Sequence, residues 1–74
     1  MRDLKGRASE TQHIARFFDY EHLPPPLWQI SALCHDVADG MIAALPDGPE
    51  LTAGLRKLLE AKDCFVRAAL PPKE

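Results

Sequence analysis

The sequence has few cysteines, and their spacing fits neither a metal site nor a disulfide framework. Cys34 and Cys64 are the only two cysteines in 74 residues, and no Cys-x-x-Cys motif occurs. We therefore expect two free thiols in a reducing compartment. The three histidines, at positions 13, 22 and 35, include no pair one helical turn apart. Neither a metal site nor a cofactor is expected.

Long apolar runs and an excess of positive charge are also lacking. No stretch approaches the ~18 apolar residues that cross a bilayer, and the first residues do not read as a signal peptide. We therefore expect a cytoplasmic protein without a membrane partner. Nine Lys and Arg against eleven Asp and Glu give a net charge of −2. This balance argues against binding to a nucleic acid polymer.

A catalytic constellation is lacking as well. Ser31, His35 and Asp39 follow one another at intervals of four and would share one helix face, which imitates the order of a triad. A triad also needs an oxyanion hole and a substrate cleft, and a lone helical hairpin offers neither. We expect no catalytic residues and no enzymatic activity.

The apolar periodicity that is present predicts an all-α protein. We expect an antiparallel two-helix hairpin with a short N-terminal helix or extended arm, assembled as a homo-oligomeric helical bundle. Ser9 and Gln12 fit a capping box, and the prolines at 24–26 predict a stiff connector. The predicted segments are a flexible lead (1–8), a single domain (9–70) made of an N-terminal arm (9–26), a helix (27–45), a turn (46–49) and a helix (50–70), and a C-terminal tail (71–74).

The first long helix carries two groups of side chains with different expected contacts. Seven should pack on the second helix: Leu27, Ile30, Cys34, Val37, Ala38, Met41 and Leu45. A lateral face should contact another subunit, the N-terminal aromatics or a ligand: Trp28, Ser31, His35, Asp39 and Ile42. Gly40 indicates a close helix approach. Because so short a chain has only a marginal core, we expect self-association.

Lys62 lies within the apolar stripe of the second helix rather than on its charged face. That stripe consists of Leu51, Leu55, Leu58, Leu59, Phe65, Val66 and Ala69. An unpaired ammonium is costly to bury. Its head should therefore reach solvent at the hairpin edge, pair with Asp36 or Glu60, or contact an anionic ligand. The sequence leaves these three environments open.

Two stretches resemble a known family. They are Phe18-Asp19-Tyr20 with the prolines that follow, and Leu-Arg-Lys-Leu-Leu-Glu-Ala-Lys-Asp at 55–63, with Arg67 after it. Both are similar to small phage and prophage proteins that share a helical-hairpin domain with the anti-CBASS and anti-Thoeris nucleotide sponges. The resemblance covers roughly residues 17–70. It implies a dimer-based homo-oligomer, with a hexamer as one form. It also implies sequestration of cyclic di- or trinucleotides or cyclic ADP-ribose isomers, without hydrolysis, so that host anti-phage defence is not activated.

The resemblance also suggests binding residues. Phe18 and Tyr20 match the family's aromatic pair, which stacks on bases, and Lys57 and Glu60 match its second-helix motif. Phosphates need basic donors and bases need aromatic platforms, so the candidate ligand-binding residues are Phe18, Tyr20, His22, Trp28, Arg56, Lys57, Lys62 and Arg67. One hairpin cannot enclose such a ligand, so a pocket would form between protomers.

Each candidate has an ordinary structural interpretation too. The aromatics suit a core or an interface, and the basic residues suit a solvated helix face.

Two other functions stay open. One is an oligomeric protein-interaction module that uses the face of Trp28, His35 and Ile42. The other is a small DNA-binding regulator, which the acidic balance disfavours.

Overall fold

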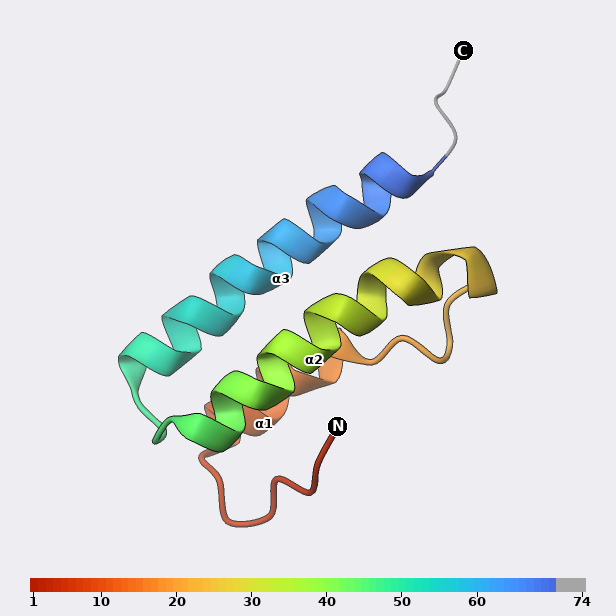
Figure 1. Cartoon of the computed structure of the whole chain (residues 1–74). Helices are drawn as coiled ribbons and strands as arrows, with labels where there is room; N and C mark the ends of the chain where they lie inside the picture. Colours follow the sequence, from red (N-terminus) through yellow and green to blue (C-terminus); the bar gives the residue numbers. More distant parts are fainter. Residues whose placement is uncertain (71–74) are drawn as a thin grey trace.

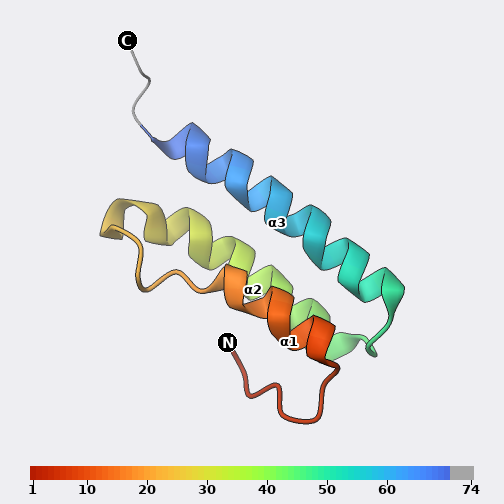
Figure 2. The ribbon, with the colours of Figure 1, turned by 180° about the vertical axis from the view of Figure 1, so that it is seen from behind.

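Three helices make up the computed structural model, which describes residues 1–70; the predicted C-terminal tail (71–74) lies outside the described residues. The helices are α1 (Ser9–Ala15), α2 (Trp28–Ala44) and α3 (Pro49–Ala69), and single 3₁₀ turns occur at Arg16–Phe18 and Pro25–Leu27. The prediction of an all-α chain is confirmed for the residues described. α2 and α3 lie side by side in opposite directions, and α1 lies along one side of this pair (Figures 1 and 2).

Proline and backbone geometry define the ends of the two long helices. Pro49 occupies the first turn of α3, where its missing N–H costs nothing, and Glu50 follows near the positive end of the helix dipole. Leu45 ends α2 in an extended conformation, with φ −122° and ψ 147°, as a residue before proline must. Pro25 opens a 3₁₀ turn, so regular α-helix begins only at Trp28.

The start of α1 differs from the predicted capping box. Ala8, not Ser9, is the capping residue, and no side chain of α1 closes the helix end. The Ala8 N–H instead donates to Asp47 Oδ2 at 2.9 Å, from the turn between α2 and α3. The Gln12 amide donates to the Arg7 carbonyl at 2.8 Å. A carboxylate distant in the sequence thus replaces the local serine, which is why the sequence pattern was misleading.

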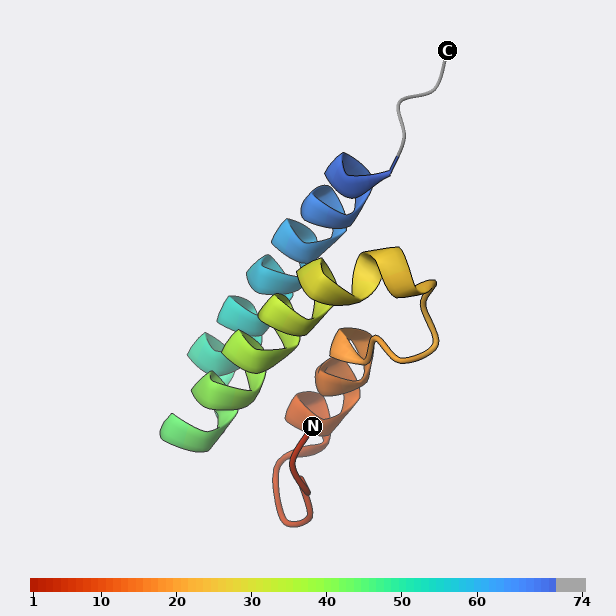
Figure 3. The same cartoon turned by 45° about the vertical axis from the view of Figure 1, so that its right-hand side comes forward.

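The core lies where α1 and its 3₁₀ turn meet the α2–α3 pair. α1 contacts α3, and the turn Arg16–Phe18 contacts α2. Figure 3 shows the α1 segment running alongside α2. Eight buried residues form this core: Ile14, Ala15, Phe18, Cys34, Ala38, Ile42, Leu51 and Leu55. The lateral face of α2 is therefore covered by the N-terminal segment, one of the alternatives predicted for it. The Tyr20 ring lies 5.4 Å from the His35 ring, edge to face.

The predicted contact face of α2 is only partly buried. Val37, Met41 and Leu45 are exposed, although they were expected to pack on the second helix. Because α1 fills one side of the pair, the buried stripe is centred on Ala38, and Val37 lies about 100° around the helix from it. The predicted close approach at Gly40 is also wrong: a Cβ built there would meet no heavy atom within 4 Å.

The N-terminal lead makes specific contacts, contrary to the prediction of a flexible segment. Gly6 has φ +87°, a left-handed conformation that suits glycine, and the Arg7 N–H donates to the Leu4 carbonyl at 3.0 Å across the resulting turn. Arg2 forms two side-chain hydrogen bonds to Asp39, at 2.8 and 3.0 Å. These charged partners are distant in the sequence, so the composition of the lead did not indicate them.

Candidate functional site

Three of the predicted aromatic ligands lie in the connector before α2 and in the first turn of that helix. Trp28 is 41% exposed, and its indole N–H donates to the Leu23 carbonyl at 2.8 Å, which fixes the ring at the protein surface. His22 is exposed, and Tyr20 is half-buried against His35. Tyr20, His22 and Trp28 therefore form one aromatic region at the start of α2, available in part to solvent.

Three predicted basic ligands lie along the exposed surface of α3. Arg56, Lys57 and Arg67 are all exposed. Within residues 1–70 none of the three has a carboxylate within ion-pair distance, and Arg67 contacts only the Cys64 sulfur, at 3.4 Å. Eleven residues of helix separate Arg56 from Arg67, or about 16 Å along the axis. A single chain therefore does not gather these cations into one site.

Lys62 has neither of the two environments predicted for it within the chain, which were solvent at the hairpin edge and a carboxylate partner. It is 8% exposed, and its Nζ donates to the backbone carbonyl of Phe17 at 2.6 Å. The 3₁₀ turn that ends the α1 segment leaves this carbonyl without a helical partner, and a cation at a helix C-terminus is favourable. Among the described residues Lys62 forms no ion pair with Asp36 or Glu60. The ammonium therefore closes a helix end inside the protein.

Phe18 also belongs to the interior rather than to a ligand platform. Its side chain is fully buried, and its ring centroid lies 6.0 Å from Lys62 Nζ. A ring that is covered on all sides cannot stack on a base, and the contact with the ammonium adds a cation–π attraction to the core. Phe17, beside it in the sequence, is exposed. Neighbouring side chains of a 3₁₀ turn point about 120° apart, so Phe18 faces the core and Phe17 faces solvent.

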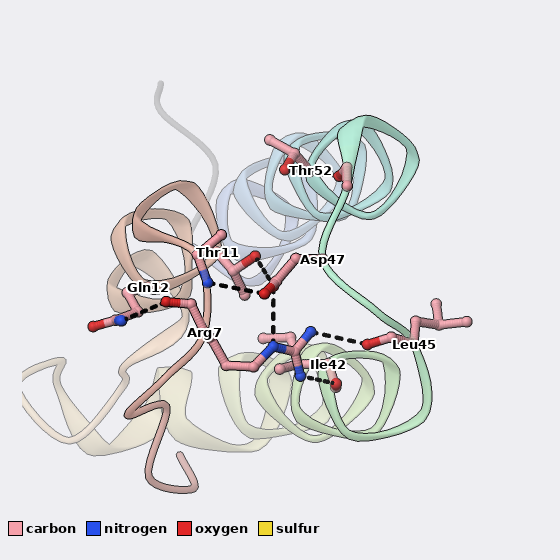
Figure 4. Close-up of polar contacts among 9 residues, drawn as sticks. Arg7, Thr11, Gln12, Ile42, Leu45, Asp47 and Thr52 are labelled. Atoms are coloured by element: carbon pink, nitrogen blue, oxygen red, sulfur yellow. Dashed lines mark hydrogen bonds and ion pairs between the residues drawn. The ribbon is translucent and has the colours of Figure 1, made fainter.

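A polar cluster around Asp47 joins the N-terminal lead to the turn between the long helices (Figure 4). Asp47 Oδ1 accepts hydrogen bonds from Thr11 Oγ1 at 2.7 Å and from Arg7 Nε at 3.0 Å, and Oδ2 accepts one from Ala8. The Thr11 hydroxyl, followed by the Ala8 N–H and the Arg7 guanidinium, lowers the pKa of Asp47 below its usual 3.8. We name Arg7, Ala8, Thr11 and Asp47 the Asp47 cluster.

Arg7 extends this cluster to the end of α2. Its two terminal nitrogens donate to the carbonyls of Ile42 and Leu45, at 2.6 and 2.9 Å. The Ile42 carbonyl belongs to the last turn of α2 and the Leu45 carbonyl to its C-cap, where acceptors lack intrahelical partners. Nothing in the local sequence predicted this role: Asp47-Gly48 reads as a turn, and Arg7 reads as one charge in a basic lead. Coordinated substitution of Arg7 and Asp47 in related sequences would be the signal that reveals this contact.

Beside the cluster lies a cavity of about 560 Å³ with mixed lining. Thr11, Thr52 and Arg56 face it, together with the carboxylate-bearing residues Glu10 and Asp47. Arg56 is the only predicted ligand residue that lines it. Two carboxylates beside one guanidinium make this cavity unsuited to a polyanionic ligand.

An apolar groove runs between α2 and α3. One cavity of about 500 Å³ is lined by Ile30, Leu33, Cys34, Val37, Leu58, Phe65, Ala68 and Ala69. A second, of about 270 Å³, is lined by Val37, Met41, Leu45, Glu50, Leu51, Gly54, Leu55 and Leu58. Val37 and Leu58 line both cavities, which makes them one continuous surface. We name it the apolar groove; none of the eight predicted ligand residues lines it.

The arrangement of titratable groups on α2 does not form a catalytic relay. The Ser31 hydroxyl is buried without a hydrogen-bond partner, and His35 Nδ1 lies 3.2 Å from Asp36 Oδ1. The Asp39 carboxylate is bonded to Arg2, which lowers its pKa to about 2. Ser31, His35 and Asp39 therefore share no hydrogen bond with one another, and the buried Ser31 is not part of a hydrogen-bonded surface strip. Burial raises the pKa of the Cys34 thiol, and the positive charge of Lys62 partly opposes this effect.

Neither a metal site nor a membrane-spanning helix is found within residues 1–70. In the part of the chain that the structure describes, no group of three His, Cys, Asp or Glu side chains is placed to hold a metal ion. None of the helices described between residues 1 and 70 combines the length and apolarity that a membrane span requires. No family model matches the chain, and comparisons with curated proteins and with solved structures also found no match.

Proposed function

We propose that this protein binds and sequesters an anionic messenger of the cyclic nucleotide or cyclic ADP-ribose type, without catalysis, in the cytoplasm of a phage-infected bacterium. The sequence support is the resemblance of Phe18–Tyr20 and of residues 55–63 to the nucleotide sponges. Such binding would keep the messenger from the defence effectors that it activates.

The observation that carries the proposal is the presence of uncompensated cations on α3. Arg2 and Arg7 each have a carboxylate partner, whereas Arg56, Lys57 and Arg67 have none among residues 1–70. An exposed cation without a protein partner keeps its hydrogen-bond donors available for a phosphate. Of the eight predicted ligand residues, Phe18 and Lys62 are buried, and the other six are accessible at least in part.

The aromatic region supports binding of the bases. Trp28 is held by the bond to Leu23 with much of its ring exposed, and base–aromatic stacking contributes about 1–3 kcal/mol per base. The aromatic region and the cations Arg56 and Lys57 lie on different helices and at different heights. A messenger that contacts both groups would therefore lie between two copies of the α2–α3 hairpin, in a dimer-based homo-oligomer such as a hexamer.

A thermal-shift screen with cyclic dinucleotides, cyclic trinucleotides and cyclic ADP-ribose isomers tests this proposal. At least one messenger should raise the Tm, and heat denaturation should release it intact. Lys57→Gln and Arg67→Gln should reduce the shift, whereas Lys5→Gln, an exposed lysine of the N-terminal lead, serves as the matched control. An unchanged Tm with every messenger would contradict the proposal, as would release of a hydrolysed product.

The apolar groove favours a second candidate, an oligomeric protein-interaction module. The face predicted for this role is occupied within the chain, since Ile42 is buried and Tyr20 lies over His35. In this candidate function the apolar groove would instead be the surface that binds the partner protein. Capture of a single host protein by the wild type, lost in Val37→Glu and retained in Phe17→Glu, would favour this function over sequestration. The net charge of −2 continues to argue against a DNA-binding regulator.

A further inference from the structure

We propose that the apolar groove is the contact surface between two copies of this chain, related by a two-fold axis. The inference rests on the self-association included in the proposed function, and it specifies the face through which self-association occurs. It requires no messenger and is tested without one.

The groove is a large apolar surface for a chain of 74 residues. Five of its large side chains, Leu33, Val37, Met41, Leu45 and Phe65, are between 44% and 61% exposed. At roughly 80–100 Å² for each, they expose about 400–500 Å² of apolar surface, the size of the largest and often functional patch on a monomer. Glu50 is the only charged residue in the lining of the two cavities. Such a surface is expected to be covered.

The shape of the groove suits a helix as its occupant. On α3, Leu51, Leu58 and Phe65 recur every seven residues and line the groove, although Leu51 also belongs to the core; the small residues Gly54 and Ala68, three residues after Leu51 and Phe65, line it as well. This alternation of large and small side chains over three heptads is the seam into which a neighbouring helix inserts its side chains. A Cβ built on Gly54 would meet no heavy atom within 4 Å, so the space beside the seam is unfilled by the chain itself.

A second copy supplies a helix of the required kind. Leu33, Val37, Met41 and Leu45 recur every fourth residue along α2 and its C-cap, and their exposed side chains form a ridge that is one wall of the groove. Because this ridge borders the groove on the same chain, a two-fold rotation can place the ridge of each copy against the groove of the other. The two contacts are then identical, and the arrangement closes on itself.

The area available also agrees with a dimer of this chain. A specific interface buries about 800 Å² on each partner. The five exposed side chains supply about half of this area or slightly more, and the neighbouring Ile30, Leu58, Ala68 and Ala69, which line the same groove, add to it. A short peptide would cover only one of the two cavities. A second copy covers both along the full length of the α2–α3 pair.

Sedimentation equilibrium of the chain without ligand tests this inference. The wild type should have a mass at least twice that of the 8.2 kDa chain. Leu33→Glu and Val37→Glu each place a charge in the groove and should weaken association at least about 100-fold, which yields monomers. Phe17→Glu is the matched control, because Phe17 is 52% exposed but lies in the N-terminal segment. It should keep the wild-type mass.

Cysteine labelling provides the second measurement, in case the glutamate variants unfold. In a Cys64→Ser background, Leu33→Cys should react with a maleimide at least about 10-fold more slowly at a concentration that supports the dimer than after dilution to monomers. Phe17→Cys in the same background should react at one rate throughout. Rates for Leu33→Cys that do not depend on protein concentration would overturn the inference.

The outcomes separate the two proposals. A monomeric wild type overturns both the shared face and the self-association on which the proposed function depends. An oligomeric wild type whose mass is unchanged by Leu33→Glu and Val37→Glu overturns the apolar groove as the interface, but not messenger sequestration. Dissociation by both variants, with the control unaffected, supports the groove whether or not any messenger binds.

Discussion

Replacing Thr11 by valine should destabilise the fold by disconnecting α1 from the Asp47 cluster. Thr11 is fully buried, and its hydroxyl donates to Asp47 Oδ1 at 2.7 Å. Valine preserves the volume of the side chain and removes only the donor. A hydrogen bond to a charged group contributes about 1.5–3 kcal/mol. Because Asp47 is partly exposed and water can replace the lost donor, we expect the lower end of this range or slightly less, about 1 kcal/mol.

Thermal unfolding followed by circular dichroism measures this loss. For a domain of this size, about 1 kcal/mol corresponds to a Tm lower by about 4–8 °C. Thr52→Val is the matched control. Its hydroxyl donates at 3.2 Å to the carbonyl of Gly48, the N-cap residue of α3, and that carbonyl already accepts the Thr52 N–H at 3.1 Å. This variant should lose less than about 0.5 kcal/mol.

The pH dependence distinguishes a lost bond to a carboxylate from a general packing defect. The pKa of Asp47 is lowered in the folded protein, so its contribution to stability is present above the ordinary value of 3.8 and is lost as the pH falls through the lower folded-state pKa. The difference in Tm between wild type and Thr11→Val should therefore shrink below pH 3.8. Equal losses for Thr11→Val and Thr52→Val, or a difference that does not depend on pH, would refute the reasoning.

Three further predictions concern the residues whose environments differ most from expectation. Lys62→Ala should lower the free energy of unfolding by about 2 kcal/mol, because it removes a buried side-chain stem and the donor to the Phe17 carbonyl. Lys57→Ala should leave the Tm unchanged and weaken messenger binding, as measured by calorimetry. Phe18→Ala should abolish the cooperative melt, since the loss of about 3–5 kcal/mol approaches the whole stability of so small a domain, and a Phe17→Ala variant that melts equally poorly would contradict this explanation. In acid titration followed by circular dichroism, wild-type stability should fall as the pH drops from 3.8 through about 2, the pKa of Asp39 in the folded state. Asp39→Asn should remove the loss of stability that Asp39 causes over this pH range.

Features of the sequence that act locally predicted much of the secondary structure. Pro46 and Pro49 delimit the turn, and the apolar period identifies the two long helices, because both signals depend only on neighbouring residues. The position of α1 was less accessible. Because α1 docks beside α2, the buried stripe of α2 is centred on Ala38 and not on Val37. The apolar periodicity of α2 alone cannot show which of two neighbouring stripes a third helix will cover.

The candidate site was predicted less well than the fold, and for the same reason. Phe18 and Phe17 are adjacent and identical in chemistry, so only the 3₁₀ turn distinguishes the buried ring from the exposed one. Lys62 was recognised as an unusual cation, but its partner is a backbone carbonyl, which every residue possesses and no sequence pattern marks. The messenger itself stays a prediction, supported by resemblance and by the unpaired cations of α3.

The Asp47 cluster has a consequence for how the chain folds. The bond from Arg7 to Asp47 closes a loop of 40 residues, and the entropy of closing such a loop is about 3 kcal/mol before any contact compensates for it. Because the contact also requires the turn that carries Asp47, we expect the N-terminal segment to dock only after α2 and α3 have paired. Truncation of the first eight residues would remove the anchor that holds α1 in place, although those residues look dispensable in the sequence.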